Sequence, residues 1–498
     1  MPSNHHLTPD AVLRAARGQS PLPDIDRTAM ARSHDFVVEA VSDLPVYGRS
    51  TGVGANKSVD LDESNSIDQD LRLLRSHAVG AGDLVDDETV RIAMIIRLNQ
   101  LLHGGSGISP DIAPAMRALI DSGAAPRIHS VGSLGTGDLS QLAELALTLL
   151  GEAPTQDGET HSHWRPHGGD ALPFLSGNAF TVAAALTASA EIDNYLDHVV
   201  LTSVASMRLV GASVEPFAEA VQTARPQPGQ HEAAAAIRAA IGETSWQSRR
   251  LQDSFGFRAL TPVLAALLTA RNRLVAAIEV EINASVENPH IAPASREVLH
   301  NGNFHTQQLM LDLEAATLAL LGTAQLSAAR TMRLSDPEIT GLEPFLSDDT
   351  PGSSGAMMVE YITASALGSL RLHAQPASLS TTIVARGTED HAPLTAHAAH
   401  QLLAGLAQAR RILAVELLMA GRGLALTELG SGRGPEPATA SAPFLDYIER
   451  APLDPALADR PLTDDIARLE EFVSTTVEGP ASDLLDITLR NDAKDIAP

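Results

Sequence analysis

The sequence predicts an all-α fold organised around long helices. Hydrophobic residues make up 44% of the 498-residue chain, but aromatic residues make up only 3%. Alanine and leucine have high helix propensity, whereas strands prefer β-branched and aromatic side chains. Runs rich in alanine and leucine at 261–283, 307–332 and 355–372 each allow a helix well above the mean length of about 11–12 residues. Long helices in succession indicate a bundle in which neighbours bury each other's apolar stripes.

Shorter helices are delimited by residues that favour helix starts and ends. A capping residue or a proline at the start and a glycine just past the end are typical of such helices. The positive end of a helix beginning at Asp138 would face the preceding loop and favour negative charge there. The three pairs of start and end signals are Thr8-Pro9 with Gly18, Ser109-Pro110 with Gly123, and Asp138 with Gly151.

The charge and composition exclude several classes of protein. The chain has 35 Lys+Arg and 61 Asp+Glu, a formal net charge of −26. This excess argues against binding along nucleic-acid phosphates or to an anionic membrane surface. Cysteine is absent, which excludes disulfides, thiol nucleophiles and cysteine-ligated metals. Residues 1–10 do not resemble a signal peptide, so we expect a soluble cytoplasmic protein.

One uncharged stretch reaches the length of a membrane span. Residues 171–190 carry no Asp, Glu, Lys or Arg, but Pro173 and the sequence Ser176-Gly177-Asn178 interrupt them. We therefore expect a buried segment there.

Histidines gather in two parts of the chain. His161, His163 and His167 fall in a polar stretch, 151–170, without carboxylates at metal-ligand spacing, so we expect a solvated loop and no metal site. His391, His397 and His400 are expected on one helix, in core or interface positions. A second polar connection, 427–441, is expected to precede a C-terminal helical piece at 456–477.

Four polar, glycine-containing segments interrupt the helical pattern and are the candidates for chemistry. They are 47–54 (YGRSTGVG), 130–139 (SVGSLGTGDL), 252–258 (QDSFGFR) and 301–305 (NGNFH). The first is either a flexible turn or a mobile loop that presents Tyr47 to a cavity, and we favour the loop because a phenol can act as general acid or base. The spacing Gly132-x-x-Gly135-x-Gly137 in the second fits neither a dinucleotide-binding motif nor a P-loop.

Eight motifs in order resemble the histidine/phenylalanine/tyrosine ammonia-lyase family, from about residue 7 to about residue 396. The family's Tyr-Gly-x-x-Thr-Gly-Phe-Gly loop is matched by 47–54, with Val53 for the phenylalanine. Each motif is weak alone, but their common order is specific. The other seven are Ser76-His77-Ala78-Val79-Gly80, Arg91 and Arg97 with Asn99, Gln252-Asp253 with Arg258, Glu287-Asn288-Pro289, Gly302-Asn303-Phe304-His305, Pro376-Ala377-Ser378 and Glu389-Asp390-His391.

The resemblance implies an all-α ammonia-lyase (fumarase/aspartase-like) fold with a central long-helix bundle. It implies a homotetramer whose active sites are built from several subunits. We expect an N-terminal domain at 1–200 with the Tyr47 loop and the 130–139 loop, a central bundle at 201–425 and a C-terminal helical cap at 426–498. The expected partners are an amino-acid-like small molecule and further copies of the chain, with no nucleic acid and no membrane.

The family's electrophile is a methylidene-imidazolone (MIO) that forms autocatalytically from an internal Ala-Ser-Gly, so no external cofactor is implied. Here the aligned triplet is Gly135-Thr136-Gly137. This triplet can still close the ring, but an alkene made from Thr136 would carry a methyl group that hinders attack by an amine. The alternative is that Thr136 stays intact and the site works without the group, or does not work.

The resemblance also implies roles for single residues. Tyr47 looks like the base that takes the β-proton, although a phenol with a pKa near ~10 needs local help to act at neutral pH. Arg258 looks like the carboxylate clamp, because a guanidinium offers a bidentate fork. His77 and Glu389 resemble residues that recognise the substrate side chain, in the pattern of the histidine-specific branch.

Other implied positions line the pocket or depart from the family. Gln252 and Phe304 resemble pocket-lining residues, whereas we expect Arg91 and Arg97 to hold helices by ion pairs. The departures are Ser176, which stands in place of an active-site asparagine of the family, and Phe255, which stands in place of its second active-site tyrosine.

Three hypotheses follow. The first is an ammonia lyase or aminomutase with a methyl-substituted MIO made from Gly135-Thr136-Gly137. The second, which we favour, is a Tyr47-initiated β-elimination, or a related addition or cyclisation, on an amino-acid-like carboxylate without a standard MIO. The third is a non-catalytic helical scaffold.

Overall fold

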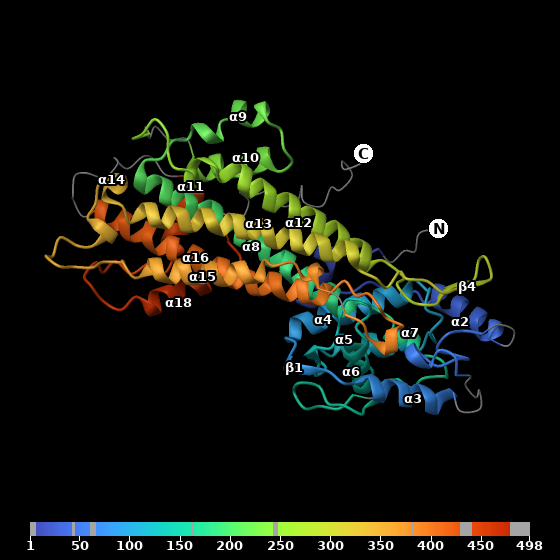
Figure 1. The fold of residues 1–498 in the computed structure, drawn as a ribbon. Coiled ribbons are helices and arrows are strands. Elements are labelled where there is room, and N and C mark those ends of the chain that lie inside the picture. The colour runs from blue at the N-terminus through green and yellow to red at the C-terminus, as the bar shows by residue number, and fades with distance from the viewer. Residues whose placement is uncertain are drawn as a thin grey trace. The chain divides into compact units, whose positions relative to one another are not determined.

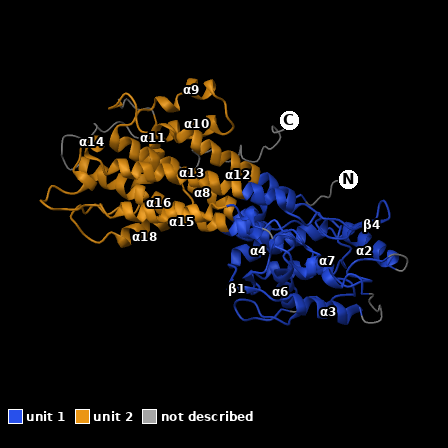
Figure 2. Ribbon diagram, viewed as in Figure 1, with its two compact units in different colours: residues 1–187, 275–313, 376–400 blue, residues 188–274, 314–375, 401–498 orange. Residues whose placement is uncertain are grey.

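The computed structural model describes residues 6–41, 45–59, 66–161, 164–242, 248–380, 382–428 and 441–478. The chain forms two compact units, each assembled from three stretches of sequence (Figures 1 and 2). Unit 1 comprises 1–187, 275–313 and 376–400, and unit 2 comprises 188–274, 314–375 and 401–498. Each unit thus combines stretches that are far apart in the chain, and the three consecutive domains expected from the sequence stay a prediction.

Four long helices contribute residues to both units, as the sequence predicts for a bundle. They are α8 (Ala179–Val210), α12 (Leu260–Ile282), α13 (Gln307–Leu334) and α16 (Thr395–Glu428). The predicted runs at 261–283 and 307–332 match α12 and α13 to within two residues at each end. The all-α prediction is confirmed.

Unit 1 adds short helices and two hairpins of two strands each. The pairs β1–β2 and β3–β4 are both antiparallel, and the sequence analysis predicts neither. The elements are α1 (Pro9–Ala16), α2 (Thr28–Ala40), η1 (Gly54–Asn56), α3 (Ser66–His77), β1 (Ala81–Leu84), α4 (Asp87–Leu102), α5 (Ile112–Asp121), β2 (His129–Val131), α6 (Leu139–Leu150), α7 (Ala171–Leu175), β3 (His290–Ala292), β4 (Glu297–Leu299), η5 (Ala377–Leu379) and η6 (Ala385–Gly387).

Unit 2 surrounds its parts of the long helices with shorter elements. The run predicted at 355–372 forms α15, and the piece predicted at 456–477 contains α18. Residues 429–440, which include most of the connection predicted at 427–441, lie outside the described residues. The elements are η3 (Glu215–Phe217), α9 (Glu219–Ala224), α10 (Gln230–Ile241), α11 (Phe255–Arg258), α14 (Pro337–Thr340), η4 (Pro344–Leu346), α15 (Val359–His373), α17 (Ala442–Arg450) and α18 (Thr463–Phe472).

The cap signals set several helix ends. The Thr8 hydroxyl accepts a hydrogen bond from the Ala11 N–H at the start of α1, with proline at the first helical position. Gly151 ends α6 in the left-handed region at φ 76°, where a glycine carries no steric cost. The predicted helix at 109–123 is α5, which starts three residues after Ser109.

The uncharged stretch at 171–190 is buried, as expected. It breaks between α7 and α8 at Ser176-Gly177-Asn178. Two helical stretches, 171–210 and 307–334, are long and apolar enough for a membrane span by length and composition alone. The most apolar window of the first is 94% buried within the protein, which is typical of a core helix, whereas that of the second is 50% buried.

His391 precedes α16, which starts at Thr395, so the prediction of one helix for His391, His397 and His400 is wrong for His391. His163 lies outside the described residues. Within the described ranges, no three His, Asp or Glu side chains are grouped to hold a metal ion.

Candidate active site

The Tyr47 loop is fixed to the core of unit 1 at two points. Val46 is fully buried in a hydrophobic cluster with Phe36 and Ile291. Gly48 has φ 75°, and a Cβ built there would lie 2.1 Å from a side-chain carbon of Leu172 in α7. Only glycine allows both this backbone conformation and this approach, so the loop lies closely against α7.

The Tyr47 phenol is half-buried and lies near Glu389. Its oxygen accepts a hydrogen bond of 2.6 Å from the Gly54 N–H. Burial raises the pKa of Tyr47, the negative charge of Glu389 raises it further, and the Gly54 hydrogen bond opposes both. Unit 1 therefore brings Tyr47 and Glu389 together from positions 342 residues apart (389 − 47). Of these influences only the Gly54 N–H favours the phenolate, and it does not outweigh burial and Glu389.

Three segments of unit 1 hold the triplet Gly135-Thr136-Gly137. The Thr306 hydroxyl donates to the Gly135 carbonyl at 2.7 Å and lies 2.7 Å from the Thr395 hydroxyl. The Gly135 N–H donates to the Ser133 hydroxyl at 3.1 Å. The Leu394 N–H donates to the Leu134 carbonyl at 2.9 Å. Thr136 itself is half-buried.

Asp138 begins α6 as predicted, but its carboxylate does not cap that helix. It is fully buried and accepts hydrogen bonds from the Ser133 hydroxyl and from the hydroxyl and N–H of Thr181 in the first turn of α8. Burial raises the pKa of Asp138, although these hydrogen bonds lower it in part. The carboxylate thus serves the N-terminus of α8, where a negative charge is also favourable.

The segment Ser176-Gly177-Asn178 lies beside the triplet. The Gly177 carbonyl accepts from the Asp138 N–H at 2.7 Å, and the Ser176 hydroxyl accepts from the Asn288 N–H at 3.2 Å. Both ends of the Asn178 amide have partners, because it accepts from Gln100 at 2.7 Å and donates to Glu281 at 2.6 Å. Asn178 therefore does not replace the asparagine that the family has at position 176.

A buried ion pair supports this segment. Arg97 has no exposed surface and donates to the Glu287 carboxylate at 3.1 Å and to the Pro173 carbonyl at 2.6 Å. A Cβ on Gly177 would lie 2.7 Å from Arg97 Nη1. The expectation that Arg97 holds structure by an ion pair agrees with these contacts. The side chain of Arg91 donates to the Ala16 carbonyl.

His77 and Phe304 lie in segments that lead to the triplet. His77 ends α3, and its Nδ1 lies 2.9 Å from the Leu73 carbonyl oxygen. The strand that follows pairs with β2, the strand just before the triplet loop. Phe304 is half-buried, two residues before Thr306. In the next residue, His305, the ring nitrogen Nε2 lies 2.8 Å from Nδ1 of His391.

Gln252, Phe255 and Arg258 belong to unit 2. The Arg258 guanidinium lies 4.6 Å from the ring centre of Phe255, whose side chain is 68% exposed. Among the described residues Arg258 has no ion-pair partner, so its charge is available to an anion. Gln252, six residues before Arg258, is exposed. The predicted site residues of a single chain thus fall into two sets, one in each unit.

The residues present do not fit a standard MIO. An exocyclic methylene requires a serine, and Thr136 would leave a methyl group on that carbon. A Cβ at position 135 would lie 2.8 Å from the backbone nitrogen of Thr395, so the site also has no room for the alanine that the family carries at this position. Thr306 and Thr395 cannot be found from the sequence, because no local pattern marks a threonine that bonds to a distant loop.

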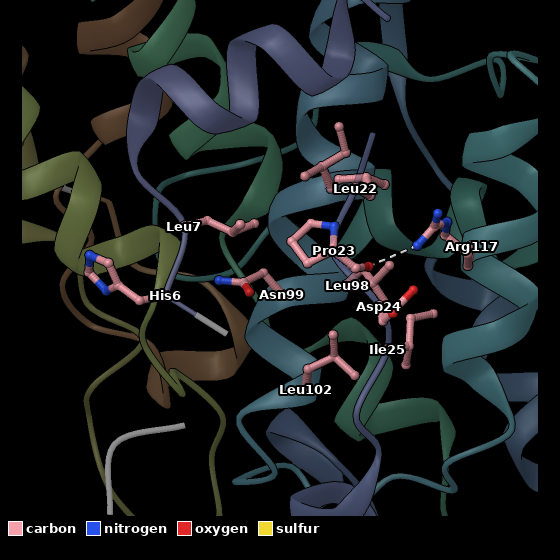
Figure 3. A pocket seen from close by; sticks show the side chains of 11 residues that line it. His6, Leu7, Leu22, Pro23, Asp24, Ile25, Leu98, Asn99, Leu102 and Arg117 are labelled. Carbon is pink, nitrogen blue, oxygen red and sulfur yellow. Dashed lines mark hydrogen bonds between the residues drawn. The ribbon is translucent and has the colours of Figure 1, made fainter. Parts of the chain in front are cut away.

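A cavity in unit 1 lies next to Tyr47, with Arg49, Leu172 and Glu287 in its wall. A second cavity, between the α1–α2 connection and α4, is shown in Figure 3. Arg117 donates there to the Pro23 carbonyl at 2.9 Å, and Asn99 is held by the Ile282 carbonyl at 2.9 Å. No predicted site residue lines this second cavity, so it is separate from the candidate site.

Known proteins resemble this chain over most of its length. The model of the aromatic amino acid lyase family matches residues 7–443. A histidine ammonia-lyase from Streptomyces avermitilis is 31% identical over 95% of this chain and 98% of its own. A probable histidine ammonia-lyase from Halobacterium salinarum is 31% identical over 97% of this chain and 98% of its own.

Solved structures share the fold. The ergothioneine-degrading enzyme ergothionase from Treponema denticola has a TM-score of 0.87 at 24% identity, and the match covers 97% of this chain and 98% of that chain. Histidine ammonia-lyase from Trypanosoma cruzi has a TM-score of 0.83 at 22% identity, and the match covers 94% of this chain and 91% of that chain. The chain belongs to the aromatic amino acid lyase family, whose members are carbon–nitrogen lyases.

Proposed function

We propose that this protein catalyses a Tyr47-initiated β-elimination on an amino-acid-like carboxylate without a standard MIO. The observation that carries the proposal is that Glu389 lies near enough to Tyr47 to raise the pKa of the phenol, in a unit that also holds a triplet lacking the alanine and serine of the family. A related addition or cyclisation would use the same groups.

The proposed step needs a base, an anion clamp and a leaving group. The Tyr47 phenolate takes the β-proton and becomes a phenol. The C–H electron pair becomes the α–β double bond, and the C–N pair leaves with the amine. The products are an unsaturated carboxylate and a free amine. Arg258 binds the substrate carboxylate by two parallel hydrogen bonds. We propose that it reaches the site from another subunit of a homotetramer.

Charge favours a substrate with a cationic amine. Glu389 and burial both raise the pKa of Tyr47, which disfavours the phenolate. A positive substrate group between the two would offset both effects, since an opposite charge nearby favours the charged form of an acid. A quaternary ammonium keeps its positive charge at any pH and leaves as a neutral tertiary amine, so an elimination without an added electrophile becomes feasible.

Exposed apolar side chains support assembly with further copies of the chain. In unit 2, Leu318 on α13 is 51% exposed, and Tyr361 and Leu372 on α15 are 67% and 65% exposed. Large exposed apolar groups on long helices are typical of protein interfaces. We propose a homotetramer in the cytoplasm.

A second candidate is a histidine or aromatic amino acid lyase or aminomutase with a methyl-substituted ring made from the triplet. The observation that favours it is the hydrogen bond from Thr306 to the Gly135 carbonyl, because a donor at this oxygen polarises the carbonyl.

Intact-mass measurement and a substrate panel separate the candidates. We expect an unmodified mass, together with elimination from a trimethylammonium betaine such as ergothioneine, and loss of turnover in Tyr47→Phe. Loss of two waters from the mass would favour the second candidate. Unchanged turnover in Tyr47→Phe would refute the proposed base. No turnover of betaines, histidine or aromatic amino acids by the folded protein would favour a scaffold.

A further inference from the structure

A fully buried ion pair lies in unit 2. Arg330 on α13 and Glu416 on α16 have no exposed side-chain surface. Two nitrogens of the guanidinium meet the two carboxylate oxygens at 2.6 Å and 2.8 Å. The Ser206 hydroxyl on α8 donates to the same carboxylate at 2.7 Å. Three helices therefore fix the position of the Arg330 guanidinium.

The third nitrogen of Arg330 supports the segment that carries Arg258. Its Nη1 donates to the Gly256 carbonyl, the second residue of α11, at 2.9 Å. A Cβ on Gly256 would lie 3.2 Å from Arg330 Cγ and 3.4 Å from the Arg330 backbone nitrogen. The missing side chain thus lets α11 lie directly on α13.

The short helix α11 needs such support. It has four residues, and a helix of that length is not stable by itself. Just before it, the Asp253 carboxylate accepts from the Ser213 N–H at 2.6 Å and from Arg250 at 2.9 Å. These contacts fix its start, whereas Arg330 holds its middle, two residues before Arg258.

An ion pair of this kind is poorly explained by stability. Removing two charges from water is costly, and replacing a buried pair with apolar residues of similar size is often neutral or stabilising. A geometric role explains it better, because a guanidinium with two nitrogens fixed by a carboxylate presents its third at a set angle.

We propose that Arg330, held by Glu416, is a positioning residue that sets the orientation of α11 and hence of the Arg258 guanidinium. The inference rests on the proposed function, in which Arg258 binds the substrate carboxylate. The Phe255 ring moves with α11, so the stacked Phe255–Arg258 pair is positioned as one group.

The test replaces the pair without leaving a buried charge. The double variant Arg330→Met/Glu416→Leu is compared with Arg271→Met/Asp193→Leu, which removes another ion pair of unit 2, with a distance of 2.6 Å. Hydrogen exchange of a peptide covering 252–258 reports on α11 without any substrate. We expect exchange there to accelerate at least tenfold in the first double variant only.

Kinetics then connect position to binding. With a substrate found in the panel, we expect KM to rise at least tenfold and kcat to fall less than threefold in Arg330→Met/Glu416→Leu, with both unchanged in the control. Unchanged exchange at 252–258 would overturn the proposal. Faster exchange with wild-type KM would overturn the link to Arg258.

Two further outcomes are distinguishable. If the double variant does not fold, Glu416→Gln keeps the volume and one acceptor, and it should give a smaller change of the same kind, whereas wild-type exchange in this variant would count against the proposal. If the wild-type protein turns over no substrate, the proposed function fails, but the exchange result still decides whether Arg330 positions α11.

Discussion

The substitution Gly135→Ala restores the family's alanine at the first position of the triplet, and the structure predicts that it destabilises the protein. The backbone of Gly135 has φ 82°, which an alanine adopts at a cost. The new Cβ would also lie 2.8 Å from three atoms of Thr395, namely its backbone nitrogen, Cβ and Oγ1. The backbone nitrogen belongs to the first residue of α16, so a rotamer change cannot relieve the contact.

The magnitude follows from two contributions. A left-handed conformation costs a non-glycine residue about 1–2 kcal/mol. Overpacking a rigid site costs about 1–3 kcal/mol, so the free energy of unfolding should fall by about 2–5 kcal/mol in total. Gly123→Ala is the matched control, because Gly123 has φ 75° and nothing within 4 Å of an added Cβ. Only the conformational part, about 1–2 kcal/mol, is expected there.

Urea denaturation measures both variants against the wild-type protein. The difference between them isolates the crowding by Thr395, which should be at least ~1 kcal/mol. Equal urea midpoints for Gly135→Ala and Gly123→Ala would refute the argument that Thr395 leaves no room for an alanine at position 135. Thr395→Gly removes Cβ and Oγ1 but keeps the backbone nitrogen, so a full recovery of stability on adding it would show that the side chain, not the backbone of α16, makes the contact.

Arg97→Met leaves Glu287 buried without its partner and should lower the free energy of unfolding by about 3–5 kcal/mol, measured in urea, whereas Arg97→Met/Glu287→Leu should recover most of this. Glu389→Gln removes a negative charge near Tyr47 and should lower the Tyr47 pKa, measured as the phenolate absorbance lost on adding Tyr47→Phe; an unchanged titration would separate the two residues. Burial raises the pKa of Asp70 from 3.8 to about 6, so its contribution to stability is present below pH 3.8 and lost as the pH rises through 6. Asp70→Asn should therefore reduce the difference in Tm between pH 4 and pH 7, and an equal difference in both proteins would contradict this.

Much of the fold follows from local signals. The long alanine- and leucine-rich runs and the caps at Thr8 and Gly151 are set by interactions within a few residues, which a sequence displays directly. The hairpins β1–β2 and β3–β4 are not visible in this way, because strands of three or four residues carry too short a pattern. The role of Asp138 was also hidden, since its carboxylate bonds to Thr181, 43 residues further along the chain.

The candidate site could be predicted only in part. The order of eight motifs pointed to Tyr47, Glu389 and the triplet, and unit 1 holds all of them. Single residues could not reveal the support around them. Thr306 and Thr395 act through a hydrogen bond to the Gly135 carbonyl and through occupied space, and neither property depends on their local sequence.

The segment at 176–178 shows why residue order, and not only residue type, decides the chemistry of this centre. Gly177 is fixed by its carbonyl, which binds the Asp138 N–H, and by Arg97, which fills the space of a side chain. With the glycine fixed, the residues on its two sides have different partners. Ser176 accepts from the Asn288 backbone, whereas both ends of the Asn178 amide are already used by Gln100 and Glu281. An asparagine is therefore present but unavailable, and a site that needs an amide at position 176 must work here with a hydroxyl.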